Sequence, residues 1–161
     1  MALGGGLLAS HIWQDHTLNF VRVPRAVNQK PIEWWTLPPF PFEIGHFAAH
    51  APENLFVVAE INEGSVDFPM QALSTQRLIV RRYVDLHLLN LMDGSPHRAP
   101  PSNVIRWQFS MAAGVVSVRC LLITGSRLMM YVYRPETPDA GDQVGRILVW
   151  DWKTRDLVSM P

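Results

Sequence analysis

Residues 146–158 read Arg-Ile-Leu-Val-Trp-Asp-Trp-Lys-Thr-Arg-Asp-Leu-Val. Ile147, Val149 and Trp152 are apolar, whereas Asp151 and Lys153 are polar, and this pattern is typical of a β-strand. The run Lys-Thr-Arg-Asp that follows has the composition of a turn, and Leu157 after it is apolar again. The stretch therefore predicts a strand, a polar turn and the start of the next strand, which together form a hairpin.

The same order of apolar and polar residues recurs twice upstream. Residues 86–91 repeat the pattern of 147–152, and residues 18–23 carry it once more. Each copy follows an earlier β-rich run, and these runs are residues 6–9, 55–59 and 128–133. A unit of roughly sixty residues thus appears about three times, longer than the ~40–50 residues of a common propeller blade. Such units cannot bury both of their faces alone, so they must stack on their neighbours.

The sequence predicts an all-β chain that forms an incomplete β-propeller-like stack of about three antiparallel sheets. Helix signals are nearly absent, and closure of a propeller normally takes about four blades or more. We expect one domain with repeat units 1–37, 38–101 and 102–161, and we interpret the chain as a fragment of a larger propeller. The expected strand pairs are 7–12 with 17–23, 44–50 with 55–61 around a turn at 51–54, and a strand 128–133 that follows a turn at 124–127.

Several of these segments resemble one protein family. They are residues 5–24, the run Leu-Phe-Val-Val-Ala-Glu at 55–60, Leu86-His87-Leu88 with Asp-Gly-Ser-Pro-His at 93–97, and Val-Trp-Asp-Trp-Lys-Thr at 149–154. Together they look like the region that follows the F-box in a large family of fungal F-box proteins, a region that resembles an irregular β-propeller. The resemblance implies a non-catalytic substrate receptor of a ubiquitin ligase. It implies a Skp1-type adaptor as a partner only if an F-box exists upstream of Met1.

Composition and charge set limits on the protein's class. The chain has 161 residues, of which 48% are hydrophobic and 17% charged, and this composition is typical of a folded domain. Fourteen basic and fourteen acidic residues leave no net charge, so we expect neither nucleic acid nor a membrane as a partner. The single cysteine, Cys120, excludes an internal disulfide, and we expect it to be buried. Without a targeting segment, the expected location is intracellular, cytoplasmic or nuclear.

Four residues offer an alternative, enzymatic interpretation. His46 and His50 would share one face of a helix, but on a strand they lie about 13 Å apart, too far to hold one metal ion. Asp85 and His87 would project from the same face of a strand, where the carboxylate could orient the imidazole. A surface polar pair is the commoner arrangement, so we expect no catalytic residue, metal or cofactor. A small β-scaffold enzyme and a truncated product without independent function remain the alternatives.

The lengths of the connections indicate a binding surface. The turns at 51–54, 92–95, 124–127 and 153–156 are short, whereas the connections 24–42, 62–76 and 134–145 are long. Five prolines exclude a helix in 24–42 and leave at most a short edge strand there. Long loops at one end of a rigid scaffold commonly carry binding residues. We therefore predict that a protein partner contacts Trp34, Trp35, Asn62 and Arg134.

A second group of residues is predicted to be structural. Asp93 and Gly94 form a strong hairpin signal. Trp150, Asp151 and Trp152 are expected to support packing within and between the sheets. Because an open stack leaves strand edges and an apolar face to water, we also expect self-association through the open edges.

Overall fold

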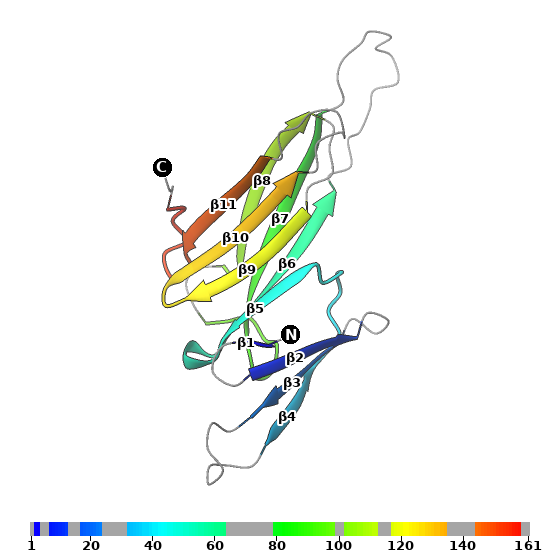
Figure 1. Ribbon diagram of the computed structural model, residues 1–161, viewed down its shortest axis with the longest axis vertical. Coiled ribbons are helices and arrows are strands. Elements are labelled where there is room, and N and C mark those ends of the chain that lie inside the picture. The colour runs from blue at the N-terminus through cyan, green and yellow to red at the C-terminus, as the bar shows by residue number, and fades with distance from the viewer. Residues whose placement is uncertain are drawn as a thin grey trace.

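A computed structural model of the protein describes residues 2–3, 7–12, 17–23, 32–63, 79–98, 102–112, 117–134 and 144–158. These residues form strands in three antiparallel sheets, stacked in an open rather than a closed arrangement (Figure 1). The described ranges contain no α-helix. The predicted all-β fold class, an incomplete propeller-like stack, is confirmed.

The first sheet contains the N-terminal strands in the order β1-β2-β3-β4. Its strands are β1 (Ala2–Leu3), β2 (Leu7–Ile12), β3 (Thr17–Arg22) and β4 (Glu33–Leu37). β2 pairs with β3 as predicted, with Leu8 opposite Val21. β4 is short and lies at the edge of the sheet, as the proline-rich composition of 24–42 allows.

The second sheet is the middle of the stack. Its order is β5 (His46–His50), β6 (Leu55–Glu63), β7 (Ile79–Asn90) and β8 (Val104–Ala112), with a 3-10 turn, η2 (Ala51–Glu53), between β5 and β6. The predicted pairing of β5 with β6 is present. β8 lies in the range expected for the third unit, but it pairs with β7. The second sheet therefore extends to Ala112.

The third sheet contains β9 (Ser117–Thr124), β10 (Arg127–Arg134) and β11 (Val144–Asp151), with β10 in the centre. β11 is followed by a tight turn and a single bridge between Trp150 and Leu157. The predicted hairpin at 146–158 thus exists, with its second strand reduced to one bridge. An equivalent bridge joins Leu89 and Pro96 at the end of β7 in the second sheet.

The second sheet carries a core cluster on each of its two faces, because each outer sheet packs against one of them. One core cluster combines side chains of the second and third sheets, and the other combines the first and second sheets. Along β6, Leu55, Val57 and Ala59 face the third sheet, whereas Phe56 and Val58 face the first. All five are fully buried. This burial explains why residues 55–59 of β6 are an unbroken apolar run instead of an alternating one.

The turns after β7 and β11 have the same backbone. In the first, Asn90 accepts a hydrogen bond from the Gly94 N–H, and in the second, Asp151 accepts one from the Arg155 N–H. Gly94 has φ 71° and Arg155 has φ 69°. A left-handed residue is therefore built into both turns, and glycine meets this requirement at lower cost than arginine.

Candidate functional surfaces

The four predicted binding residues belong to three different sheets. Trp34 and Trp35 lie on β4, Asn62 lies on β6, and Arg134 is the last residue of β10. The two tryptophans lie on the short edge strand that the proline-rich composition of 24–42 allows, and not in the loop part of that connection, because residues 33–37 pair with β3. Most residues of the other two long connections, and the side chain of Arg134, lie outside the described part of the structure.

Trp35 is a packing residue between two sheets. Its ring stacks on Phe20 with 5.3 Å between centroids and 11° between planes. Its Nε1–H donates a 2.8 Å hydrogen bond to the carbonyl oxygen of Leu91, in the turn after β7. Strand alternation sends the neighbouring Trp34 to the opposite face of the sheet. The two tryptophans therefore have different roles.

Trp34 stands on the face of the first sheet that points away from the second sheet. Its side chain is 74% exposed. Leu8 pairs with Val21 and Val21 pairs with Trp34, so the three side chains form one row across β2, β3 and β4. We call this row, together with the exposed Val23 and Ile32, the Trp34 face.

Polar residues flank the Trp34 face without adding charge. Ser10, Asn19 and Thr36 form the next row across the same three strands, and the Thr36 hydroxyl donates a 2.6 Å hydrogen bond to Asn19 Oδ1. The charged pair of this sheet, Arg22 with Glu33, lies on the opposite side of the strands. Among the side chains that the structure describes on β2, β3 and β4, none on the outward face carries a charge.

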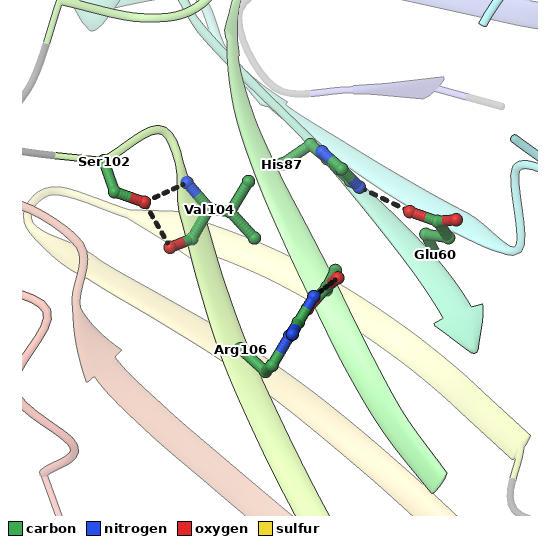
Figure 2. A network of polar contacts seen from close by, with 6 residues as sticks. Glu60, His87, Ser102, Val104 and Arg106 are labelled. Atoms are coloured by element: carbon green, nitrogen blue, oxygen red, sulfur yellow. Dashed lines mark hydrogen bonds and ion pairs between the residues drawn. The ribbon is translucent and has the colours of Figure 1, made fainter. Parts of the chain in front are cut away.

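A polar network lies on the face of the second sheet that points toward the first (Figure 2). Arg106 on β8 donates from Nε to Asp85 Oδ1 and from Nη2 to Asp85 Oδ2, both at 2.7 Å. The guanidinium also lies 4.3 Å from the centroid of the Tyr83 ring. Asp85 raises the pKa of Arg106, chiefly through its hydrogen bonds and then its charge. This two-point pair fixes Arg106 across the strands, although the arginine side chain is 60% exposed.

His87 has a different carboxylate partner. Its Nε2 lies 2.7 Å from Glu60 Oε2 on β6, as Figure 2 shows. Its ring stacks on Phe42 with 4.3 Å between centroids. The predicted pair of Asp85 with His87 is therefore not formed. Arg106 lies directly opposite Asp85 on β8, whereas Glu60 on β6 is the diagonal neighbour of His87. Each side chain therefore pairs with a residue on an adjacent strand instead of with the residue two positions away on β7.

The histidines of β5 do not assemble a metal site with other described residues. His46 and His50 share the face of β5 that carries the buried Ala48, which belongs to the core with the third sheet. Burial and the charge of Arg119 lower the pKa of His46. The described ranges contain no group of three or more His, Cys, Asp or Glu side chains placed to hold a metal ion.

Cys120 is exposed, so the expectation that it is buried is wrong. The register between β9 and β10 shifts: Tyr131 lies opposite Cys120, whereas Val132 lies opposite Val118. Arg119 is thus an extra residue, and this bulge resets the alternation of buried and exposed side chains. Cys120 joins Tyr131 and Ile147 in a row on the outward face of the third sheet.

The residues predicted to be structural gather in the two turns. The Asp93 carboxylate accepts hydrogen bonds from the backbone N–H and the hydroxyl of Ser95, and Asp151 accepts one from the Lys153 N–H. Trp150 is buried against Trp107 of β8, with 6.3 Å between ring centroids. In each turn, an aspartate side chain thus accepts a hydrogen bond from a backbone N–H two residues later.

Trp152 and its neighbours connect the second and third sheets. The Trp152 ring is buried, and its Nε1–H donates a 2.9 Å hydrogen bond to the Gly125 carbonyl. His97, from the turn after β7, meets this ring edge-on with 5.5 Å between centroids. Lys153 pairs with Glu53 of η2 at 2.9 Å and lowers the pKa of that carboxyl. The two sheets are therefore linked by side chains of their turns.

Comparisons of the chain with models of protein families, with curated proteins and with solved structures find no match. Within the described residues there is also no helix with the length and apolar character needed to cross a bilayer.

Proposed function

We propose that the chain is a non-catalytic protein-interaction module that resembles the substrate-receptor region of an F-box ubiquitin-ligase subunit. The Trp34 face is the surface that binds the protein partner. The observation that carries this proposal is the 74% exposure of Trp34 in an apolar row with Leu8 and Val21. Tryptophan is among the residues that contribute most to binding energy at protein interfaces, and contiguous exposed apolar surface marks such interfaces.

The backbone beneath Trp34 is held in place before any partner binds. The opposite face of β4 is fixed by the stacking of Trp35 on Phe20, by the Trp35 hydrogen bond to Leu91 and by the buried Leu37. A preorganised anchor loses little conformational freedom on binding. This arrangement distinguishes Trp34 from an exposed aromatic residue on an unpaired loop.

The chemistry of the face specifies the kind of partner. Its described side chains are apolar or uncharged and polar, so the partner presents an uncharged apolar surface with a few hydrogen-bonding groups. Affinity should depend little on salt, because no charge pair is screened. In the proposed receptor role this partner is the protein to be modified, and the chemical step belongs to another subunit.

The test compares two variants on the same face. Proteins captured from a lysate by the wild-type chain, by Trp34→Ala and by Thr36→Ala would be identified, and the affinity of each purified candidate would be measured. We expect Trp34→Ala to weaken the affinity for the true partner by about 30-fold or more, the equivalent of ~2 kcal/mol. Thr36→Ala should change this affinity little. Unchanged thermal unfolding of both variants is the control. A set of partners that binds equally well to all three chains contradicts the proposal.

Self-association is the competing outcome, and the same variants detect it. If a second copy covers the Trp34 face, sedimentation of the wild-type chain will show a concentration-dependent dimer that Trp34→Ala abolishes. The Trp34 face would then be an interface between copies instead of a receptor surface.

A further inference from the structure

The third sheet differs from the other two at one edge. In the first sheet β3 pairs with β4, and in the second β7 pairs with β8. In the third sheet β11 pairs with β10, and on its other edge the described chain supplies only the bridge between Trp150 and Leu157. Apart from that bridge, no residue that the structure describes occupies the position of a fourth strand beside β11.

Hydrogen bonds in the two turns fix the correspondence between β7 and β11. His97 N–H donates to the Leu88 carbonyl at 3.0 Å, and Val158 N–H donates to the Val149 carbonyl at 2.6 Å. The bridge from Leu89 to Pro96 closes the first turn, and the bridge from Trp150 to Leu157 closes the second. The number of residues from Leu89 to Trp150 equals the number from Pro96 to Leu157. Leu88 therefore corresponds to Val149. The same offset aligns Leu86 with Ile147 and Asp85 with Arg146.

On β7, one set of backbone N–H and C=O groups pairs with β8. The corresponding groups on β11 have no partner among the described residues. Leu88 N–H donates a 2.7 Å hydrogen bond to the Asn103 carbonyl, and Leu86 lies opposite Ile105. By correspondence, the backbone groups of Ile147 and the N–H of Val149 point to the open edge. The register of β11 with β10 is continuous, without a bulge, and its sequence contains no proline. A regular, unprotected edge of this kind is a template for an added strand.

The charge at the open edge is reversed relative to the second sheet. Asp85 holds Arg106 of the fourth strand through two hydrogen bonds. The corresponding residue in the third sheet is Arg146, which is exposed and forms no ion pair with the described residues. Arg146 lies on the same face of β11 as Leu148, which packs toward the second sheet. A carboxylate directly across from Arg146 would form the equivalent ion pair, with the arginine on the third strand and the acid on the fourth.

We propose that the β11 edge binds an extended, acidic segment of a partner protein, which adds to the third sheet as an antiparallel fourth strand. The segment places an Asp or Glu opposite Arg146. By analogy with Ile105 and Arg106 on β8, it places an apolar residue opposite Ile147, immediately before the acidic one. Ile147 is 56% exposed, and the added side chain would cover it.

A second copy of the chain fits this edge less well. Antiparallel pairing of two β11 strands centred on residue 146 places the Arg146 side chains of the two copies opposite each other, and pairing centred on Ile147 places each Arg146 opposite Leu148, so neither register gives Arg146 a carboxylate. Like charges directly across a sheet are destabilising. The observations therefore favour an acidic segment of another protein. This edge is separate from the Trp34 face, so failure of this proposal leaves the proposed function standing.

The probes are two synthetic peptides with the sequence of residues 102–110, one unchanged and one with R106E. Fluorescence anisotropy would measure their binding to the full chain, and amide hydrogen exchange would report on Ile147 and Val149. We expect the R106E peptide to bind about tenfold more tightly than the unchanged peptide and to protect both amides. Arg146→Glu should reverse this preference. Arg98→Glu, an exposed change of equal charge on the turn after β7, should keep the wild-type preference.

Three results would overturn the proposal. One is equal binding of both peptides to the wild-type chain. Another is binding that leaves the exchange of the Ile147 and Val149 amides unchanged. The third is protection of these amides in the chain alone, which would mean that another part of the chain or a second copy already occupies the edge. Thermal unfolding of Arg146→Glu confirms that the variant is folded before any loss of binding is interpreted.

Discussion

The second and third sheets use the same arrangement of strands and turns but have different surroundings. The second sheet is covered on both faces, and its β7 has partners on both edges. The third sheet is covered on one face, and the described part of β11 has a full partner on one edge only. The turns after β7 and β11 nevertheless have equivalent hydrogen bonds. Local backbone structure is thus set by the turn sequences, whereas burial is set by the neighbouring sheets.

The largest difference in stability should appear when one apolar side chain is truncated in the second sheet and one on the outward face of the third. Phe56→Ala in β6 should destabilise the protein by about 3–5 kcal/mol, because the buried ring contacts Phe20, Phe40 and Phe47. Leu122→Ala, on the outward face of the third sheet, should cost less than about 1 kcal/mol. Urea unfolding measures both. Equal losses would mean that the outward face of the third sheet is covered in solution.

A smaller effect should follow from loss of an indole hydrogen bond. Trp152→Phe removes the Nε1–H donor to the Gly125 carbonyl and replaces the indole with a smaller, apolar phenyl ring. We expect a loss of about 1–2 kcal/mol, from the unmatched carbonyl and the incomplete packing. Trp35→Phe removes the equivalent donor to Leu91 and should have a similar effect. Chemical denaturation of both variants would show whether the two indole hydrogen bonds contribute equally to the free energy of unfolding.

The two turns should respond unequally to substitution of their left-handed residues. Gly94→Ala introduces a Cβ at φ 71° and should cost about 1 kcal/mol. Arg155→Gly removes a Cβ at φ 69°, so relief of backbone strain opposes the loss of the arginine contacts. We expect its change in the free energy of unfolding to be smaller than that of Gly94→Ala. A larger loss for Arg155→Gly would assign the stability of that turn to the side chain.

The smallest effect concerns pH. Burial and Arg119 lower the pKa of His46, on the β5 face toward the third sheet, below its ordinary value of 6.5. Between the two values the unfolded chain binds more protons than the folded chain, so stability rises with pH and falls as the pH drops through 6.5. His46→Gln should flatten this part of the stability profile. Thermal unfolding between about pH 5 and 8 tests it, and a profile that the substitution leaves unchanged would exclude His46 as the cause.

Much of the architecture could be predicted from the sequence, because strand patterns repeat locally. The repeated pattern at 146–158, 86–91 and 18–23 falls on β11, β7 and β3, the third strand of each sheet in chain order. The apolar runs before them fall on β2, β6 and β10. Period-two patterns and turn residues are local signals, so they survive without knowledge of the neighbouring sheets.

The sites were harder to predict, because they depend on which strands pair. Arg106 is the partner of Asp85 only through the register of β7 with β8, and the pattern of β8 alone does not give that register. The proline content of 24–42 allowed a short edge strand but did not locate it, so the strand that carries Trp34 was included in a long connection. The exposure of Cys120 depends on the bulge at Arg119, which a regular alternation does not reveal.

The stacking order of the sheets also has a consequence for synthesis of the chain. The first sheet, made from residues up to Leu37, packs its apolar face against Phe56, Val58, Leu89 and Leu91 of the second. While the ribosome is still adding residues between Leu37 and Leu91, the nascent first sheet has no complete surface on which to fold. Its Phe20 and Trp35 rings are then available to other chains or to chaperones. The folded protein is therefore vulnerable to misassembly during translation of that interval.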